Sequence, residues 1–210
     1  AFSYVEQIGA EHDVKYPSCV IDSLAISGDS LNRIMGTCTF RGSGKRVTPS
    51  GVNFATQVGS SSDLHYFYNT QVGMHFESLG AMIGSLDYTC DYDNFSFAVR
   101  NGLNPEGGYR AGCGKYQVDE DSTSGAIRSE LLFGQRDISL SFTVRLNTSS
   151  DEYEYLQTQS LLSGYVEMTG ADITGAYKHK LKIELEKTAM EAITIAAEAD
   201  NMVTLQINLR

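Results

Sequence analysis

The chain has 210 residues, of which 41% are hydrophobic and 20% are charged, and its formal net charge is −10 at pH 7. This composition is typical of a globular protein and argues against disorder. The charge excludes a broad surface for binding nucleic acid or anionic membranes, because such surfaces need many Lys and Arg residues to neutralise phosphates. All-β chains of this length commonly form one domain, so we expect a single domain over residues 1–210.

Apolar and polar residues alternate along most of the chain, and this period of two residues predicts β-strands. The clearest example is residues 137–145, where Ile138, Leu140, Phe142 and Val144 would point to one side. Earlier strands are expected over residues 19–27, 35–41, 65–69, 85–92, 95–100 and 127–133. Later strands are expected over residues 164–169, 180–186, 189–198 and 203–209. Because each strand has one apolar and one polar face, the sequence predicts an all-β fold, an antiparallel sandwich or barrel.

One amphipathic helix is expected to flank this sheet, between Ser149 and Gly164. Ser149 fits the N-cap position, and Glu152, three residues later, completes a capping box. Tyr155 and Leu162 would share the apolar face of the helix, and Gly164 would end it. We therefore expect a helix that supports the sheet structurally.

Two long stretches lack the alternation and are expected to be loops. Residues 42–62 are rich in Gly, Ser and Thr, and residues 101–124 are rich in Gly and end in an acidic run. Loops of this length in a compact domain are usually functional or mobile. The first loop contains Lys45 and Arg46 within a partial phosphate-binding pattern that lacks its first glycine and its final hydroxyl residue. We interpret it as a basic surface loop.

The sequence predicts no catalytic residue, no cofactor site and no metal site. A nucleophile elbow and a paired-histidine zinc motif are both missing from it. Cys113 lies between two glycines beside Lys115, where an ordinary turn cysteine is the simpler interpretation. Asp91 and Asp93 lack the further ligands of a calcium-binding loop, which favours a solvated acidic surface. The cysteines expected to be buried free thiols are Cys19, Cys38 and Cys90.

One stretch has an unusual distribution of charge. Residues 47–99 contain no Lys or Arg, yet they include Asp63, Glu77, Asp87, Asp91 and Asp93. Chance in an acidic chain explains this about as well as a functional acidic surface does, and both interpretations stay open. An acidic surface would repel the phosphates of nucleic acid.

Several segments, taken in chain order, form a recurring pattern of strands and turns. The first is YPSCVIDSLAISG at residues 16–28, followed by a hairpin and a second strand that ends in FRG at residues 40–42. The later segments are GSLDY at residues 84–88, SLSFTV at residues 139–144, the helix, MTG at residues 168–170, KLKIEL at residues 180–185 and a closing strand that ends at Arg210. This order covers most of the chain and resembles the tail tube (major tail) proteins of long-tailed phages and prophages.

The resemblance implies a structural virion protein that is not an enzyme. Six copies would form a ring, and stacked rings would form the phage tail tube, assembled in the bacterial host cytoplasm. The partners would be copies of the chain itself and other tail proteins such as the tape measure protein, with no cofactor and no membrane. DNA would pass through the tube without specific binding. Because members of this family often carry further sequence before the first matching strand, we expect an upstream segment.

The resemblance also suggests roles for particular residues. Strands from six copies would close into one inner barrel, and carboxylates in its lumen would repel passing DNA. The candidate lumen residues are Asp87, Asp91 and Asp93, whose neutralisation should slow DNA passage without preventing tube formation. The loop over residues 42–62 would reach the neighbouring ring, where Lys45 and Arg46 would meet acidic partners.

Two other classes of function remain open at this point. The chain could be a β-sandwich binding module, such as an adhesin or carbohydrate-binding domain, with Tyr66, Phe67 and Tyr68 stacking on sugars. Tyr66 and Tyr68 would share a face, as a platform or as part of the core. An enzyme with a carboxylate pair, such as a glycosidase, is the less favoured alternative, since no acidic residue is distinguished from the solvated ones.

Overall fold

The computed structural model describes residues 2–8, 12–29, 32–42, 66–79, 85–88, 92–104, 115–118, 124–127, 132–145, 151–174, 177–197 and 203–210. The chain divides into two compact units. The first comprises residues 1–24, 37–62 and 99–137, and the second comprises residues 25–36, 63–98 and 138–210. Strand β2 (His12–Asp29) contributes residues to both units, so the expectation of one domain stays a prediction.

Strands dominate the described residues, which confirms the predicted all-β class. The other strands are β1 (Phe2–Ile8), β3 (Met35–Arg41), β4 (Val72–Ser78), β5 (Leu86–Asp87), β6 (Tyr92–Arg100), β7 (Lys115–Val118), β8 (Ser124–Ile127), β9 (Asp137–Arg145), β10 (Leu161–Thr174), β11 (Tyr177–Ala197) and β12 (Val203–Leu209). The helices are the short 3-10 helix η2 (Asn69–Gln71) and the α-helix α2 (Asp151–Thr158). Within this part of the chain, the main sheet has the order β1-β2-β6-β9-β12-β11-β10-β4-β5, with β3 also paired to β2, and it does not close into a barrel.

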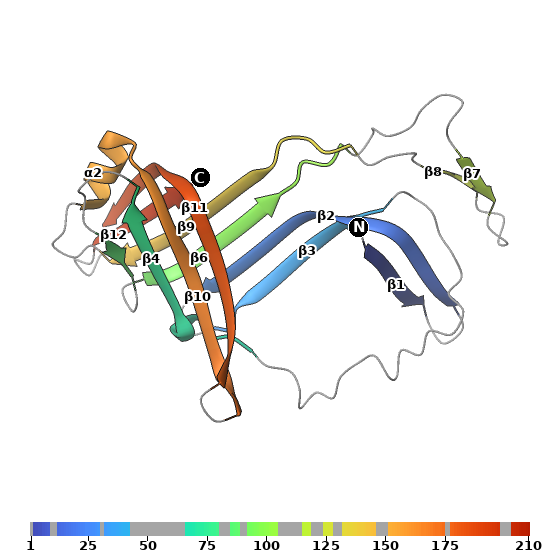
Figure 1. Ribbon diagram of the computed structural model, residues 1–210, viewed down its shortest axis with the longest axis horizontal. Helices are drawn as coiled ribbons and strands as arrows, with labels where there is room; N and C mark the ends of the chain where they lie inside the picture. Colours follow the sequence, from blue (N-terminus) through green and yellow to red (C-terminus); the bar gives the residue numbers. More distant parts are fainter. Residues whose placement is uncertain are drawn as a thin grey trace. The chain divides into compact units, whose positions relative to one another are not determined.

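The second unit is built around β11, which belongs to two layers of strands. Residues 177–189 of β11 pair with β10, and residues 190–197 pair with β12, all antiparallel. One extra β11 residue interrupts the register on each side of this change, between Leu185 and Thr188 and again between Met190 and Ala192. Such bulges bend a strand, and here β11 passes from the β4–β10 layer to the β9–β12 layer. Figure 1 shows β4, β10 and β11 crossing the strands of the other layer.

The apolar core of the second unit lies between these two layers. Phe76 of β4 stacks on Phe142 of β9, with ring centroids 5.7 Å apart and an interplanar angle of 7°, although three strands separate β4 from β9 in the sheet order. Tyr88 packs on Phe142 from the side, at 5.1 Å. Burying such a side chain stabilises the fold by roughly 1.5–3 kcal/mol. Other fully buried side chains are Met74, Phe95, Leu140, Leu162, Met168, Leu205, Ile207 and Leu209.

The predicted helix is confirmed, but its predicted end is wrong. Helix α2 packs against β11 and buries Tyr155 completely. It ends at Thr158, because the next residue, Gln159, adopts a left-handed backbone conformation with φ of 49°. A left-handed residue commonly ends a helix, but it is usually Gly, so Gln159 gave no signal in the sequence. Leu162 and Gly164 are instead part of β10.

Several predicted strand boundaries are also wrong. Residues 66–69 contain only an isolated bridge at Tyr68 and the start of η2 rather than a strand. Residues 132–133 have no regular structure, and β5 covers only Leu86 and Asp87 of the strand expected over residues 85–92. The separate strands expected over residues 180–186 and 189–198 are one strand, β11. The unpredicted strands are β1, β4 and β7.

In the first unit, a cluster of hydrogen bonds on Asp22 joins β2 to β3 and to the segment after β6. The Asp22 carboxylate accepts from Arg41 Nε at 2.6 Å and from the Leu103 amide at 3.2 Å. Asn101 donates from its amide to the Asp22 carbonyl and from its side chain to the Ile21 carbonyl. Because both carboxylate oxygens of Asp22 accept hydrogen bonds within this cluster, we interpret the cluster as structural. Of the predicted buried thiols, Cys19 is buried, Cys38 is half-buried, and Cys90 lies outside the described residues.

Gly164 lies where β10 closely approaches the neighbouring strand β4. A Cβ atom at Gly164 would overlap the carbonyl oxygen of His75 and the ring of Phe76, whereas a Cβ at Gly36 meets open space. We expect Gly164→Ala to lower the free energy of unfolding by at least about 2 kcal/mol, since overpacking shifts backbone and ring together. Gly36→Ala should change it by less than about 0.5 kcal/mol. Urea unfolding of both variants measures this, and equal effects would contradict the packing described.

Candidate functional site

The three acidic residues predicted for a channel do not come together. Asp87 lies on β5 and is exposed, while its neighbours Leu86 and Tyr88 are buried. Asp93 lies at the start of β6, in the other layer, and accepts a hydrogen bond from Nη2 of Arg145 at 3.2 Å. Asp91 is outside the described residues. Asp87 and Asp93 therefore belong to different layers of the second unit.

The other predicted site residues are only partly described. Lys45 and Arg46 lie outside the described residues. Tyr66 and Tyr68 are both exposed, at 45% and 39%, whereas Phe67 is half-buried and would contact any side chain added at Gly170. The guanidinium of Arg33 lies 4.1 Å from the centroid of the Tyr66 ring, so a cation already covers one face of this ring.

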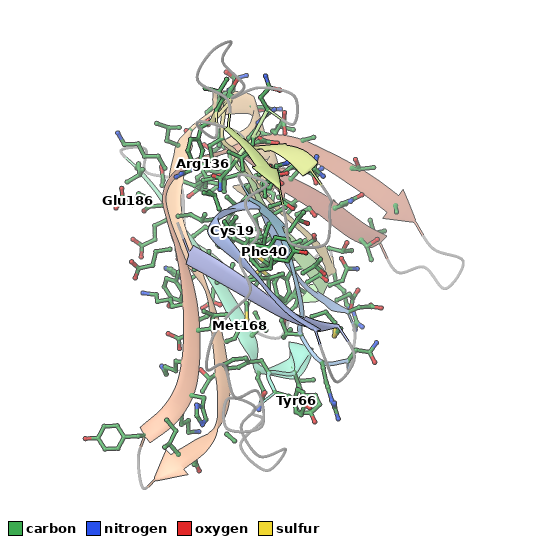
Figure 2. All side chains as sticks on the ribbon, turned by 90° about the vertical axis from the view of Figure 1, so that its right-hand side faces the viewer. Cys19, Phe40, Tyr66, Arg136, Met168 and Glu186 are labelled. Atoms are coloured by element: carbon green, nitrogen blue, oxygen red, sulfur yellow. The ribbon has the colours of Figure 1, made fainter. Side chains whose placement is uncertain are left out.

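The outer side of the β5–β4–β10–β11 layer carries many charged side chains, and we call it the charged face. Register pairs place Tyr165 beside both His75 and Glu184, and Glu167 beside Lys182. Directly paired residues point to the same side of a sheet. In Figure 2, the labelled Glu186 points away from the sheet and Met168 points to its inside. The charged face consists of His75, Glu77, Asp87, Glu167, Lys180, Lys182, Glu184 and Glu186.

A hollow of about 240 Å³ lies on the charged face, beside the first bulge of β11. Its lining is His75, Glu77, Ser163, Gly164, Tyr165, Lys182, Glu184, Leu185 and Glu186. Three carboxylates face one ammonium group, so the hollow favours a cationic group over an anionic one. His75 Nε2 lies 3.0 Å from Glu77, and Lys182 Nζ lies 2.7 Å from Glu184 and 4.3 Å from the Tyr165 ring centroid. These groups satisfy one another at the surface, and we assign them no catalytic role.

Two pKa values on this face are shifted by ion pairing. The hydrogen bond from Lys180, at 2.8 Å, is the main cause that lowers the pKa of Glu167 below its ordinary 4.5. The hydrogen bond to Glu184 raises the pKa of Lys182 above 10.5. Both shifts favour the charged forms. The face therefore keeps its alternating charges across the physiological pH range.

The shift at Glu167 can be tested directly. Because its folded pKa lies below the ordinary value, its stabilising effect is present above pH 4.5 and is lost as the pH falls through the lowered pKa. We expect Lys180→Ala to raise the pKa of Glu167 towards 4.5 in an NMR titration. Lys178→Ala, which removes the 3.7 Å pair with Asp172, is the control and should leave this pKa nearly unchanged.

The outer side of the other layer is chemically different, and we call it the neutral face. Register pairs form rows across it: Ala192 beside Asn208 beside Ser141, and then Thr194 beside Gln206 beside Thr143. The neighbouring strand β6 adds Asn94 and Ser96, which alternate with the buried Phe95 and Phe97. The neutral face consists of Asn94, Ser96, Ser139, Ser141, Thr143, Ala192, Thr194, Ala196, Gln206 and Asn208. The sequence showed these polar positions, but only the register shows that they are contiguous.

One buried carboxyl group connects α2 to the core. Glu152 is only 6% exposed, and its Oε1 accepts a hydrogen bond from the Tyr88 hydroxyl at 3.0 Å. Its other oxygen, Oε2, has no hydrogen-bond partner among the described residues. Glu152 therefore depends strongly on Tyr88, while its predicted capping partner Ser149 lies outside the described residues.

Removing the Tyr88 hydroxyl should lower the stability of the fold. We expect Tyr88→Phe to lower the free energy of unfolding by about 1–3 kcal/mol, because a buried carboxyl loses its donor. Tyr66→Phe, at an exposed tyrosine, should cost less than about 0.5 kcal/mol. Denaturant unfolding of the two variants compares them, and similar losses would show that the Tyr88–Glu152 bond contributes little.

Comparisons with known proteins do not assign the chain to a family. No protein-family model matches it, and no curated protein matches it. Among the described residues, no cluster of three His, Cys, Asp or Glu side chains could hold a metal ion. None of the helices in this part of the chain is long and apolar enough to cross a membrane.

Proposed function

We propose that the protein is a structural subunit of a phage tail tube. Six copies form a ring, rings stack into the tube, and the tube lies in the virion tail after assembly in the bacterial host cytoplasm. The partners are further copies and other tail proteins such as the tape measure protein. The resemblance of the strand and turn order suggests this function, and the all-β second unit, in which α2 packs on β11, is compatible with it. No catalytic residue, cofactor or membrane contact is part of the proposal.

The observation that carries the assembly step is the exposure of large apolar side chains in the second unit. Tyr177 is 76% exposed and Ile173 is 58% exposed, and both lie at the end of the β10–β11 hairpin. Met35 and Ile195 are 65% and 56% exposed. Exposed apolar groups of this size are characteristic of protein–protein interfaces when they gather on one element. A neighbouring copy would remove them from water.

The edge of the sheet supports the same conclusion. At the end of the described strand order, β5 pairs with His75 and Phe76 of the seven-residue strand β4. The Tyr88 amide adds one further hydrogen bond, to the Met74 carbonyl. The edge strand of a sheet is a place where another strand can pair. Pairing between copies would extend the sheet around a ring.

Assembly is tested by negative-stain electron microscopy and by the solution mass of the purified chain. We expect rings or hollow tubes and a mass that is a multiple of six chains. A monodisperse monomer would contradict the proposal.

A substitution at the end of the β10–β11 hairpin tests whether this end forms the contact between copies. We expect Ile173→Asp to reduce ring formation at least about tenfold while the melting temperature stays within a few degrees, because an exposed side chain contributes little to the monomer fold. Gln157→Asp, which adds the same charge at an exposed position of α2, should assemble normally. Normal rings from Ile173→Asp would exclude the hairpin end from the interface.

A binding module remains the second candidate, favoured by the exposure of both Tyr66 and Tyr68. Exposed aromatic rings can stack on sugars, although Arg33 already covers one face of Tyr66. A glycan array separates the two functions. Glycan binding that is lost in Tyr68→Ala, by a protein that stays monomeric, would support the binding module over the tube subunit.

A further inference from the structure

The sequence contains a single Asn-Gly pair, Asn101-Gly102, directly after β6 in the first unit. Asparagine side chains are chemically labile in proteins. An asparagine followed by glycine is the most reactive case, because glycine has no Cβ atom to hinder attack by its backbone nitrogen. Gly102 is exposed, and its N–H donates no hydrogen bond among the described residues. The pair therefore has the chemistry of a site of spontaneous deamidation.

The deamidation reaction needs water as its only further reactant. The Gly102 nitrogen attacks Cγ of Asn101, which forms a new C–N bond and a five-membered succinimide ring. The bond between Cγ and Nδ2 breaks, and the side-chain nitrogen leaves as ammonia with the proton from the Gly102 N–H. Water then opens the ring at one of its two carbonyl carbons and gives aspartate or isoaspartate at position 101. Nothing is oxidised or reduced, and the chain gains a negative charge.

In the folded chain, hydrogen bonds hold both the backbone and the side chain of Asn101. Its Nδ2 donates to the Ile21 carbonyl at 2.7 Å, and its Oδ1 accepts from Arg136 Nε at 2.9 Å. Its backbone N–H donates to the Asp22 carbonyl at 2.7 Å. Both ends of the side-chain amide are therefore engaged. Because Nδ2 is the leaving nitrogen, the bond to Ile21 must break before ammonia can depart.

The residues after Asn101 are fixed as well. The Leu103 amide donates to the Asp22 carboxylate at 3.2 Å, and the Leu103 side chain is buried. The Gly102 carbonyl accepts from the Gly134 amide at 3.0 Å. A Cβ atom at either glycine would overlap the opposite backbone, at the carbonyl of Gln135 or of Gly102. A succinimide ring would have to form in a backbone that is held on both sides, so the reaction requires local opening of this segment.

These contacts form a clamp, which consists of Ile21, Asp22, Asn101, Leu103 and Arg136 and lies entirely in the first unit. We propose that Asn101-Gly102 is a modification site whose deamidation is controlled by this clamp. The reaction is slow while the clamp is closed and proceeds when it opens. The population of the open state then sets the rate, as it does for other reactions of transiently opened segments.

The product of the reaction cannot restore the clamp. A carboxylate at position 101 has no N–H to donate to the Ile21 carbonyl, and it places a charged oxygen beside that carbonyl. Isoaspartate also adds a methylene group to the backbone where Gly102 already approaches Gln135 closely. Arg136 still binds the new carboxylate, but the side-chain anchor to β2 is lost. Modification therefore loosens the segment after β6 from β2 irreversibly.

Peptide mapping by mass spectrometry measures deamidation of each asparagine during incubation at mildly alkaline pH. We expect folded wild-type chain to deamidate at Asn101 at least about tenfold more slowly than the same chain unfolded in urea. Arg136→Ala removes the donor to Oδ1 at an exposed position and should speed the reaction of the folded chain at least about threefold. Arg145→Ala, which removes the pair with Asp93 in the second unit, is the matched control and should leave the rate unchanged.

Three results of this experiment would overturn the proposal. Equal rates in the folded and the unfolded wild-type chain would show that the clamp protects nothing. An unfolded chain that does not deamidate at Asn101 would show that the pair is not a modification site. A slower reaction in Arg136→Ala would mean that Arg136 promotes the reaction by polarising Oδ1, which is the opposite of protection.

The substitution Asn101→Asp tests the structural consequence separately. By hydrogen–deuterium exchange, we expect the amides of residues 101 and 103 to exchange at least about tenfold faster than in wild type, since both donate to Asp22 in the clamp. Asn94→Asp, which adds the same charge at an exposed position of β6, is the control and should leave both amides unchanged. Unchanged exchange in Asn101→Asp would contradict the loosening.

The proposal also stays testable if Asn101→Asp does not fold. Wild-type chain that has deamidated after folding is then separated from unmodified chain by ion exchange, and the same amides are measured in it. Neither experiment requires rings or tubes. Failure of the clamp proposal and failure of the proposed tube function are therefore distinguishable.

Discussion

The architecture of the second unit depends on one strand that serves two layers. β11 is 21 residues long, and its two bulges fall within residues 185–192, between the part paired with β10 and the part paired with β12. Each extra residue shifts the alternation by one position, so the core-facing residues change from Ile183 to Thr188 and Met190 and then to Ile193. This shift lets a continuous strand keep an apolar side towards the core while it bends. The stacking of Phe76 on Phe142 follows from that bend.

The same bend creates two outer faces that can carry different chemistry. On the β10 side, Glu and Lys residues alternate across strands, as in the ion pairs of Glu167 with Lys180 and of Lys182 with Glu184. On the β12 side, hydroxyl and carboxamide groups occupy the equivalent positions. Either kind of side chain would keep the outer side of a strand soluble, so solubility alone does not explain why the two faces differ. The contrast is therefore the most informative feature for function in the described residues.

Sequence reasoning identified the fold class because alternation is a local signal that burial imposes on each strand. It placed β3 and β12 over the right residues, and it recognised α2 from its capping pattern. Sequence reasoning failed at features that a local pattern of residues does not reveal. The shift in alternation at the β11 bulges looked like the boundary between two strands, and Gln159 ended a helix without the usual glycine. β4 was not predicted, although its buried Val72, Met74 and Phe76 alternate with less buried residues.

The predicted site residues show even more clearly that a local sequence signal does not define a surface. The absence of Lys and Arg from residues 47–99 suggested one acidic surface, yet Asp87 and Asp93 lie in different layers because β5 and β6 are at opposite parts of the strand order. A run of charge in sequence becomes a surface only if neighbouring strands bring it to one side. The neutral face shows the converse, because its residues come from four strands between Tyr92 and Leu209 that become neighbours only in the sheet. In an all-β protein, a functional surface is therefore found by following residues across neighbouring strands rather than along a single strand.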